Sequence, residues 1–171
     1  QYLSLGTLIF PKLSDSILDA IRDILYHYMT YFLINIMNVL IIGATFGIGY
    51  ELAKKYLNTC DNLILLGRTQ SKLEEIKQEF SSGKAKVFTE SLDVTILDDC
   101  KNKLSNIIKI NATIDKVIYC SGYYEPHDTF EIDVSLFQKT MDVNFMGMIN
   151  VFSILLPHLK NQNHGQLGIV A

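Results

Sequence analysis

The 171-residue chain contains no tryptophan, only three prolines and only two arginines, and it has no block of like charges. Its net charge is −3 and its lysines are spread along the chain, so it lacks the basic face that nucleic-acid binding requires, and no nucleic-acid partner is expected. The three cysteines, Cys60, Cys100 and Cys120, show no C-x-x-C spacing, which argues against a disulfide framework and a zinc site. A reducing, cytoplasmic setting is the simplest interpretation.

Metal-ligand spacing is also lacking. No metal site is predicted from the four histidines, which are His27, His127, His158 and His164. The chain begins with Gln1 and stops at Ala171 inside an apolar run, so we expect it to be a fragment of a longer protein. With 49% hydrophobic residues, it is long enough for one sizeable core but too short for two ordinary enzyme domains. We therefore expect one domain with an appendage.

Residues 1–36 are predicted to form a helical extension, because apolar residues recur in them at helical spacing. The stretch from Ile24 to Ala44 has no formally charged residue and is as long as a membrane span. Its polar residues and its strand-like last third favour a packed or interfacial helix followed by a buried strand. Membrane contact through residues 14–36 is therefore an alternative and not the favoured interpretation. The main domain is placed at residues 37–171.

From residue 38 onward, short β-rich runs alternate with longer helical patterns. Strands are predicted at Val39–Ala44, Asn62–Leu66, Lys86–Thr89, Lys116–Cys120 and Leu167–Ala171. Helices are predicted at Gly47–Leu57, Ser71–Phe80, Ile96–Ile108 and Val134–Leu159. This alternation predicts an α/β fold of Rossmann-like type, a doubly wound parallel sheet with helices on both faces, here incomplete at the C-terminus. Such a sheet binds its ligand at the carboxyl ends of its strands.

A glycine-rich turn follows the first of these strands. Gly43, Gly47 and Gly49 form the pattern G-x-x-x-G-x-G between a predicted strand and a predicted helix. Glycines permit the tight turn, the close approach of backbone to a pyrophosphate and close helix–strand packing, while the helix N-terminus offers unpaired N–H groups to an anion. The turn is predicted to bind a dinucleotide through these glycines together with Thr45, Phe46 and Ile48.

The run from Ile42 to Gly49, IGATFGIG, resembles the T-G-x-x-x-G-I-G turn of the short-chain dehydrogenase/reductase family. Phe46 departs from the polar residue often seen in that turn, which removes one phosphate contact. Arg68 ends the second predicted strand, where families of this type place the residue that chooses between the two nicotinamide cofactors. A cation there suits a 2′-phosphate, so NADP is favoured over NAD. The alternative is a solvated arginine at a strand end.

Two further segments extend the resemblance. Asp93 and Val94 match the aspartate–hydrophobic pair that borders the adenine in this family, although Asp93 taken alone could equally be an N-cap or a turn residue. The run YCSG stands where the family has N-N-A-G, and only Gly122 and the small Ser121 before it match. Cys120 is then expected to be a small buried residue beside the cofactor and not a nucleophile.

Asn144 lies in a segment, Met141–Gly147, that resembles the V-N-x-x-G motif of the family. The resemblance implies a catalytic role for it, as the helix asparagine that organises the proton relay. Burying this amide unpaired would be costly, so a specific partner is expected, and the alternative is a buried side chain that bridges two backbones. Tyr50 and Lys54 spell Y-x-x-x-K, but they follow the glycine turn directly and are not expected to be catalytic. The family's catalytic serine and Tyr-x-x-x-Lys pair would lie beyond Ala171.

The resemblance implies an NADP-dependent oxidoreductase that transfers a hydride between NADP(H) and a carbonyl or alcohol carbon of a small molecule. We expect the 171-residue chain to bind cofactor without catalysing the reaction, and the full-length protein to be a homo-oligomer. Two alternatives stay open at this point. One is a nucleotide-binding module without catalysis, and the other is a membrane-associated reductase of lipid carbonyls that is anchored by residues 14–36.

Overall fold

The computed structural model describes residues 2–5, 8–11, 19, 21–23, 36–126 and 132–170. The chain divides into two compact units, residues 1–36 and 37–171. In the first unit, β1 (Tyr2–Leu5) pairs antiparallel with β2 (Leu8–Pro11).

The two strands precede the helix that the sequence predicts from residue 14, and the described residues 19 and 21–23 within that prediction are helical. Each strand has four residues, which is too short for the alternation of apolar and polar residues to identify a strand in the sequence. Most of the helix predicted at residues 14–36, and with it the question of a membrane anchor, lies outside the described residues.

The described part of the second unit contains one parallel sheet of five strands, in the order β5-β4-β3-β6-β7. The strands are β3 (Asn38–Ile42), β4 (Asn62–Gly67), β5 (Lys86–Ser91), β6 (Lys116–Tyr119) and β7 (Gln166–Ile169). The chain winds outward from β3 to β5, then crosses back to place β6 on the other side of β3. The direction of winding therefore reverses between β3 and β6, the position at which such sheets bind ligands.

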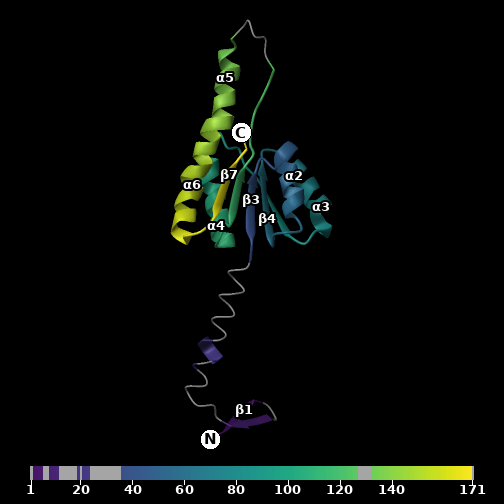
Figure 1. The fold of residues 1–171 in the computed structure, drawn as a ribbon, viewed down its shortest axis with the longest axis vertical. Helices are drawn as coiled ribbons and strands as arrows, with labels where there is room; N and C mark the ends of the chain where they lie inside the picture. The colour runs from purple at the N-terminus through teal and green to yellow at the C-terminus, as the bar shows by residue number, and fades with distance from the viewer. Residues whose placement is uncertain are drawn as a thin grey trace. The chain divides into compact units, whose positions relative to one another are not determined.

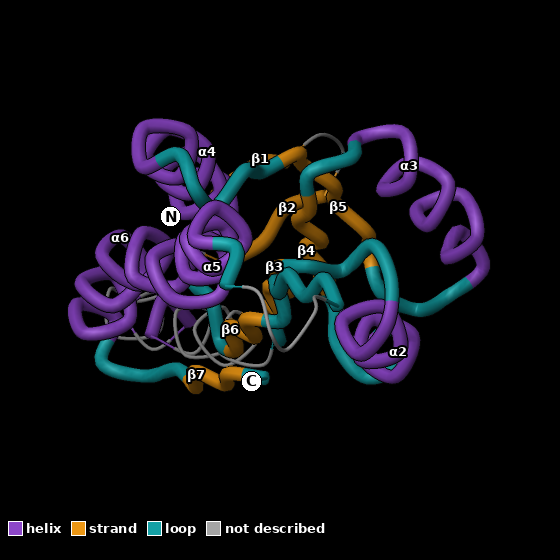
Figure 2. The backbone as a smooth tube through the Cα atoms, turned by 90° about the horizontal axis from the view of Figure 1, so that it is seen from above, coloured by secondary structure: helices purple, strands orange, loops and turns teal. Residues whose placement is uncertain are grey.

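Helices cover both faces of this sheet (Figure 1, Figure 2). One face carries α2 (Gly47–Tyr56) and α3 (Gln70–Glu79), with the short η1 (Phe80–Ser82) at the end of α3. The other face carries α4 (Leu97–Asn111) and α6 (Gly147–Gln162), whereas α5 (Val134–Met141) continues the line of α6 past the end of the sheet (Figure 1). A π-helical turn, η2 (Asp142–Met146), joins α5 to α6 inside what the sequence predicts as one continuous helix. The doubly wound α/β fold is confirmed.

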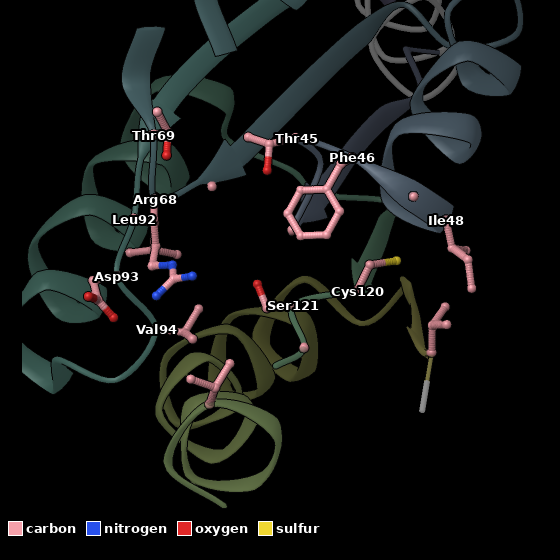
Figure 3. Close-up of a pocket in the computed structure, with 16 residues that line it drawn as sticks. Thr45, Phe46, Ile48, Arg68, Thr69, Leu92, Asp93, Val94, Cys120 and Ser121 are labelled. Atoms are coloured by element: carbon pink, nitrogen blue, oxygen red, sulfur yellow. The ribbon is translucent and has the colours of Figure 1, made fainter. Parts of the chain in front are cut away.

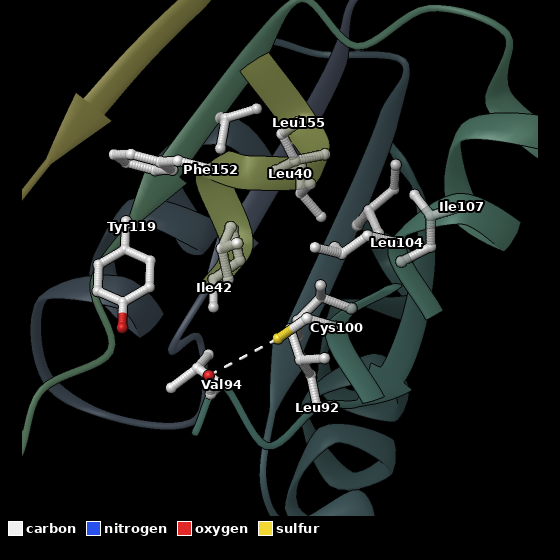
Figure 4. Packing of buried hydrophobic residues seen from close by; sticks show 14 of the residues in the cluster. Leu40, Ile42, Leu92, Val94, Cys100, Leu104, Ile107, Tyr119, Phe152 and Leu155 are labelled. Carbon is white, nitrogen blue, oxygen red and sulfur yellow. Dashed lines mark hydrogen bonds between the residues drawn. The ribbon is translucent and has the colours of Figure 1, made fainter. Parts of the chain in front are cut away.

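The neighbouring strands β3 and β4 are buried on both faces, which explains their apolar sequences. In β3, Leu40 and Ile42 pack with α4 and α6, whereas Val39 and Ile41 pack with α2 and α3. Figure 4 shows the first of these clusters, in which Tyr119 reaches into the core beside helix α6. The sheet is thus a rigid platform that ends at the turns carrying the predicted site.

The helical stretch Val134–Gln162 is, by length and composition, apolar enough to cross a membrane. One side of α6 packs against the sheet and α4, where Val151, Phe152 and Leu155 are buried. Only 28% of the apolar stretch is buried, however, and burial in the described domain therefore explains its composition only in part.

Candidate functional site

A cavity of about 250 Å³ lies where the carboxyl ends of the strands meet (Figure 3). Of the residues predicted to bind the cofactor, all but Gly49 line it: Gly43, Thr45, Phe46, Gly47, Ile48, Arg68, Asp93, Val94, Cys120, Ser121 and Gly122. The sequence analysis missed Gly67, Thr69, Leu92, Val143 and Val170, which also line the cavity. Most of these residues end a strand or directly follow one. The alternation of strands and helices, which predicts where each strand ends, was therefore the sequence signal that could have found them.

The three glycines of the turn have different surroundings. Gly43 has a φ of +87°, and a Cβ there would lie 2.5 Å from the backbone nitrogen of Ser121, so the turn packs directly on the segment after β6. Gly49 is buried, and a Cβ there would overlap the carbonyl oxygen of Gly43, so it permits α2 to pack on the end of β3. Gly47 has a φ of +60° with nothing within 4 Å of a Cβ built there. The open side of Gly47 leaves the backbone accessible to a ligand.

The N-terminus of α2 is open to an anion. Phe46 is its N-cap residue and gives no side-chain hydrogen bond to the first turn. That turn contains no acidic residue, whereas Lys54 and Lys55 lie in the last turn. The free N–H groups and the positive end of the helix dipole therefore face the cavity, and the first turn itself supplies no carboxylate that would compete with an anion.

Arg68 is the cation of this site. It is exposed, it follows β4 directly and it lines the cavity beside Thr69. Among the described residues, none is recorded in a hydrogen bond or ion pair with its guanidinium group. Arg68 is therefore available to a phosphate, for which its planar fork of donors is suited.

Asp93 forms the turn that the sequence left open as an alternative, and it also lines the cavity. Its Oδ1 accepts hydrogen bonds from the backbone N–H of Thr95 at 3.0 Å and from the Thr95 hydroxyl at 2.7 Å. The backbone N–H of Asp93 donates to Asp99 Oδ2 at 3.0 Å, and Asp99 pairs with Lys103 at 2.9 Å. Burial raises the pKa of Asp99, but these hydrogen bonds and the Lys103 charge outweigh burial and lower it. The ionised carboxylate thus holds the loop after β5.

Tyr119 connects β6 to the π turn. Its hydroxyl donates to the carbonyl oxygen of Val143 at 2.8 Å, and burial raises its pKa. A Cβ at Gly147 would lie 2.9 Å from that hydroxyl, so a glycine is needed where the helix resumes. Next to it, Cys120 is half-buried and burial raises the pKa of its thiol, which keeps the sulfur protonated at neutral pH.

Asn144 is exposed, which corrects the buried position considered in the sequence analysis. The Tyr123 backbone N–H donates to its Oδ1 at 2.6 Å, and its Nδ2 donates to the Tyr123 carbonyl at 3.0 Å. The amide therefore has the specific partner that was expected, but it holds one residue of the loop after β6 and does not bridge two buried backbones. The sequence could not show this, because helical periodicity does not locate the side chains of a π turn.

A second, larger cavity of about 800 Å³ adjoins the first and has mostly apolar and aromatic walls. It shares Phe46, Arg68, Ser121, Gly122 and Val170 with the first cavity, and it adds Tyr119, Tyr123, Tyr124, Asn144, Phe145, Met148 and Ile169. The hydroxyl of Tyr123 donates to Glu125 and accepts from Lys139 Nζ at 2.8 Å. The sequence analysis singled out Asn144 among the residues that only this cavity contains, but it did not identify the aromatic and apolar walls.

The comparisons with known proteins agree with this geometry. Residues 37–171 match the family model described as short chain dehydrogenase. The chain belongs to the short-chain dehydrogenase/reductase family. One relative is a Dictyostelium discoideum protein described as dehydrogenase/reductase SDR family protein 7-like. It is 29% identical over 140 residues, which cover 78% of this chain and 44% of the relative. The chain spans about half the length of the curated relatives it matches.

Solved structures show the same fold. An actinorhodin polyketide ketoreductase with NADPH superposes with a TM-score of 0.75 at 18% identity, over 80% of this chain and 53% of that one. The closed form of a serine dehydrogenase complexed with NADP⁺ superposes with a TM-score of 0.69 at 25% identity, over 78% and 53%. The five-stranded core of this chain is therefore the short-chain dehydrogenase/reductase core.

Two other patterns lie away from these cavities. Tyr50 of the Y-x-x-x-K run lines neither cavity and donates its hydroxyl to Glu79 of α3 at 2.6 Å. His158 and His164 are on and after α6, whereas His27 and His127 lie outside the described residues. In the described ranges, no group of three or more His, Cys, Asp or Glu side chains could hold a metal ion.

Proposed function

We propose that residues 37–171 form the NADP(H)-binding part of an oxidoreductase that transfers a hydride between NADP(H) and a carbonyl or alcohol carbon. The observation that carries the proposal is the cavity at the strand ends, which combines an uncapped helix N-terminus with a guanidinium available to a phosphate. The NADP⁺ complex of the serine dehydrogenase, a relative at 25% identity, supports the choice of cofactor.

The residues present fit such a cofactor at three places. The first turn of α2 and the open side of Gly47 suit the pyrophosphate, because both present backbone N–H groups to the cavity. Arg68 suits the 2′-phosphate that distinguishes NADP from NAD. Asp93 and Val94, at the end of β5, suit the adenine. Each of these groups comes from a different strand end, so one edge of the sheet can hold the whole adenosine half.

When bound, the reduced cofactor supplies a hydride to the carbonyl carbon, while a proton must reach the carbonyl oxygen. We propose that the larger cavity receives the substrate, because it adjoins the cofactor cavity and its walls are mostly apolar and aromatic. Asn144 lines that cavity and fixes the Tyr123 backbone through both amide atoms. Its proposed role is to organise the proton relay at this wall.

Cofactor choice is tested by titrating NADPH and NADH against the 171-residue chain and its Arg68→Ala variant. We expect NADPH to bind more tightly, and Arg68→Ala to weaken NADPH by about tenfold or more while leaving NADH nearly unchanged, because a charge-assisted phosphate contact is lost. Lys72→Ala is the matched control, since it removes one exposed positive charge on the neighbouring α3 that does not line the cavity. Equal wild-type affinity for both cofactors would refute the preference for NADP.

Hydride transfer is tested in the whole protein by following NADPH oxidation with a panel of carbonyl compounds. Asn144→Ala should lower turnover far more than it lowers NADPH affinity, because Asn144 lines the larger cavity and not the smaller one. Turnover unchanged in this variant would remove Asn144 from the mechanism.

A further inference from the structure

Phe46 is unusually exposed for an aromatic residue at a binding site. Its side chain is 74% accessible, at the N-cap position of α2. Figure 3 shows the ring and the Arg68 guanidinium bordering the same opening. A single exposed apolar residue needs no explanation, but this one lies inside a site that otherwise presents backbone N–H groups, a cation and a carboxylate.

The position of Phe46 relates it to the adenosine half of the site. Phe46 and Arg68 both line the smaller cavity, together with Leu92 and Asp93 at the end of β5. The two residues come from the turns after neighbouring strands, β3 and β4. Arg68 therefore supplies the charge at this opening, and Phe46 supplies a flat apolar surface.

A phenyl ring cannot hydrogen-bond a phosphate, so Phe46 adds nothing to the anion contacts of the turn. Its face can pack on another planar π system, and stacking of a nucleobase on an aromatic side chain contributes substantial affinity without involving a charge on the side chain. Adenine is the planar group of the adenosine half. Phe46, which stands in place of the polar residue often seen in this turn, can therefore contribute to binding by packing on adenine.

We propose that Phe46 is a cofactor-affinity residue that packs against the adenine–ribose part of the nucleotide and strengthens the binding of NADPH and NADH alike. This inference rests on the proposed function. It divides the work between two neighbouring side chains: Arg68 discriminates between the cofactors by charge, whereas Phe46 holds the part that both cofactors share.

The test measures dissociation constants of the 171-residue chain for NADPH, NADH, ADP-ribose and nicotinamide mononucleotide at low and high salt. Phe46→Ala should weaken the first three by about tenfold each, leave nicotinamide mononucleotide unchanged and leave the salt dependence unchanged. Phe46→Tyr keeps the ring and should bind within about twofold of wild type. Ile110→Ala is the matched control, because Ile110 is also 74% exposed but lines neither cavity.

The outcomes separate this inference from the proposed function. If wild type binds NADPH and Phe46→Ala leaves all affinities unchanged, the proposed function stands and the role of Phe46 is refuted. A loss confined to NADPH would also refute it, because the residue would then act on the 2′-phosphate. If wild type binds none of the adenosine ligands, both proposals fall.

Discussion

Two glycines of one turn should separate stability from binding. Gly47 and Gly49 are two residues apart, yet a Cβ at Gly47 meets nothing within 4 Å, whereas a Cβ at Gly49 overlaps the carbonyl oxygen of Gly43 and lies 3.2 Å from the Cβ of Cys120. Gly49→Ala must therefore push α2 away from the end of β3. Gly47→Ala places its methyl group in the open space at the start of α2 and moves nothing.

The magnitudes follow from these surroundings. Alanine is favoured over glycine inside a helix by roughly 0.5–1 kcal/mol, but overpacking against backbone typically costs about 1–3 kcal/mol and here cannot be relieved by a rotamer change. We expect Gly49→Ala to lower the free energy of unfolding by about 2 kcal/mol. At Gly47 the strain of a side chain at positive φ is about 1 kcal/mol, with no clash. NADPH affinity should nevertheless fall more than tenfold, since the methyl group occupies the phosphate approach.

Urea unfolding followed by circular dichroism, together with NADPH titration of each folded variant, measures both quantities. Gly168→Ala in β7 is the control, because a Cβ there meets only the Val117 carbonyl oxygen at 4.0 Å and should change neither quantity. The reasoning is refuted if Gly49→Ala unfolds at the wild-type urea concentration, or if Gly47→Ala binds NADPH as tightly as wild type.

Three further predictions concern the core and the surface. Burial, with help from nearby carboxylates, raises the pKa of Cys60 and Cys100 from 9.0 to about 11. The thiols therefore ionise at lower pH in the unfolded chain than in the folded one. The free energy of unfolding should fall by about 2 kcal/mol per cysteine as the pH rises from 9 to 11. Urea unfolding measured across this pH range should show a flatter decline in each Cys→Ala variant. Tyr119→Phe should cost about 1–2 kcal/mol in urea unfolding, because the Val143 carbonyl loses its donor, and an unchanged midpoint would contradict the contact. We expect the chain to self-associate through the exposed apolar residues of α5 and α6. Ile149→Glu should then lower the molecular mass measured by light scattering. An unchanged mass would exclude this surface as the interface.

The sequence predicts the core of this fold well because its signals are local. β3 and β4 are continuous apolar runs that a sheet buried on both faces requires, and both were identified to within two residues at either end. The glycine turn is equally local, since Gly43 sits at positive φ directly after β3 and Gly47 at positive φ at the start of α2. Signals within short segments therefore placed both the sheet and the glycine turn.

What the sequence missed depends on contacts between distant residues. The Val143 carbonyl in the π turn at Asp142–Met146 accepts a hydrogen bond from Tyr119, 24 residues earlier. The helical pattern of the segment itself does not predict the π turn. The exposed position of Asn144 goes with its bond to the backbone of Tyr123, 21 residues earlier. The larger cavity is likewise assembled from β6, η2 and β7, and no single motif contains its walls.

The site divides into parts with different tolerance to change. Gly43 and Gly49 are fixed by backbone contacts under the turn, so a substitution at either disturbs the packing of β3 and α2. Arg68 and Phe46 are exposed side chains at the opening, and replacing them removes no core contact. Cofactor preference can therefore change at Arg68, and cofactor affinity at Phe46, without loss of stability, whereas Gly43 and Gly49 cannot be replaced without disturbing the turn that the sheet supports.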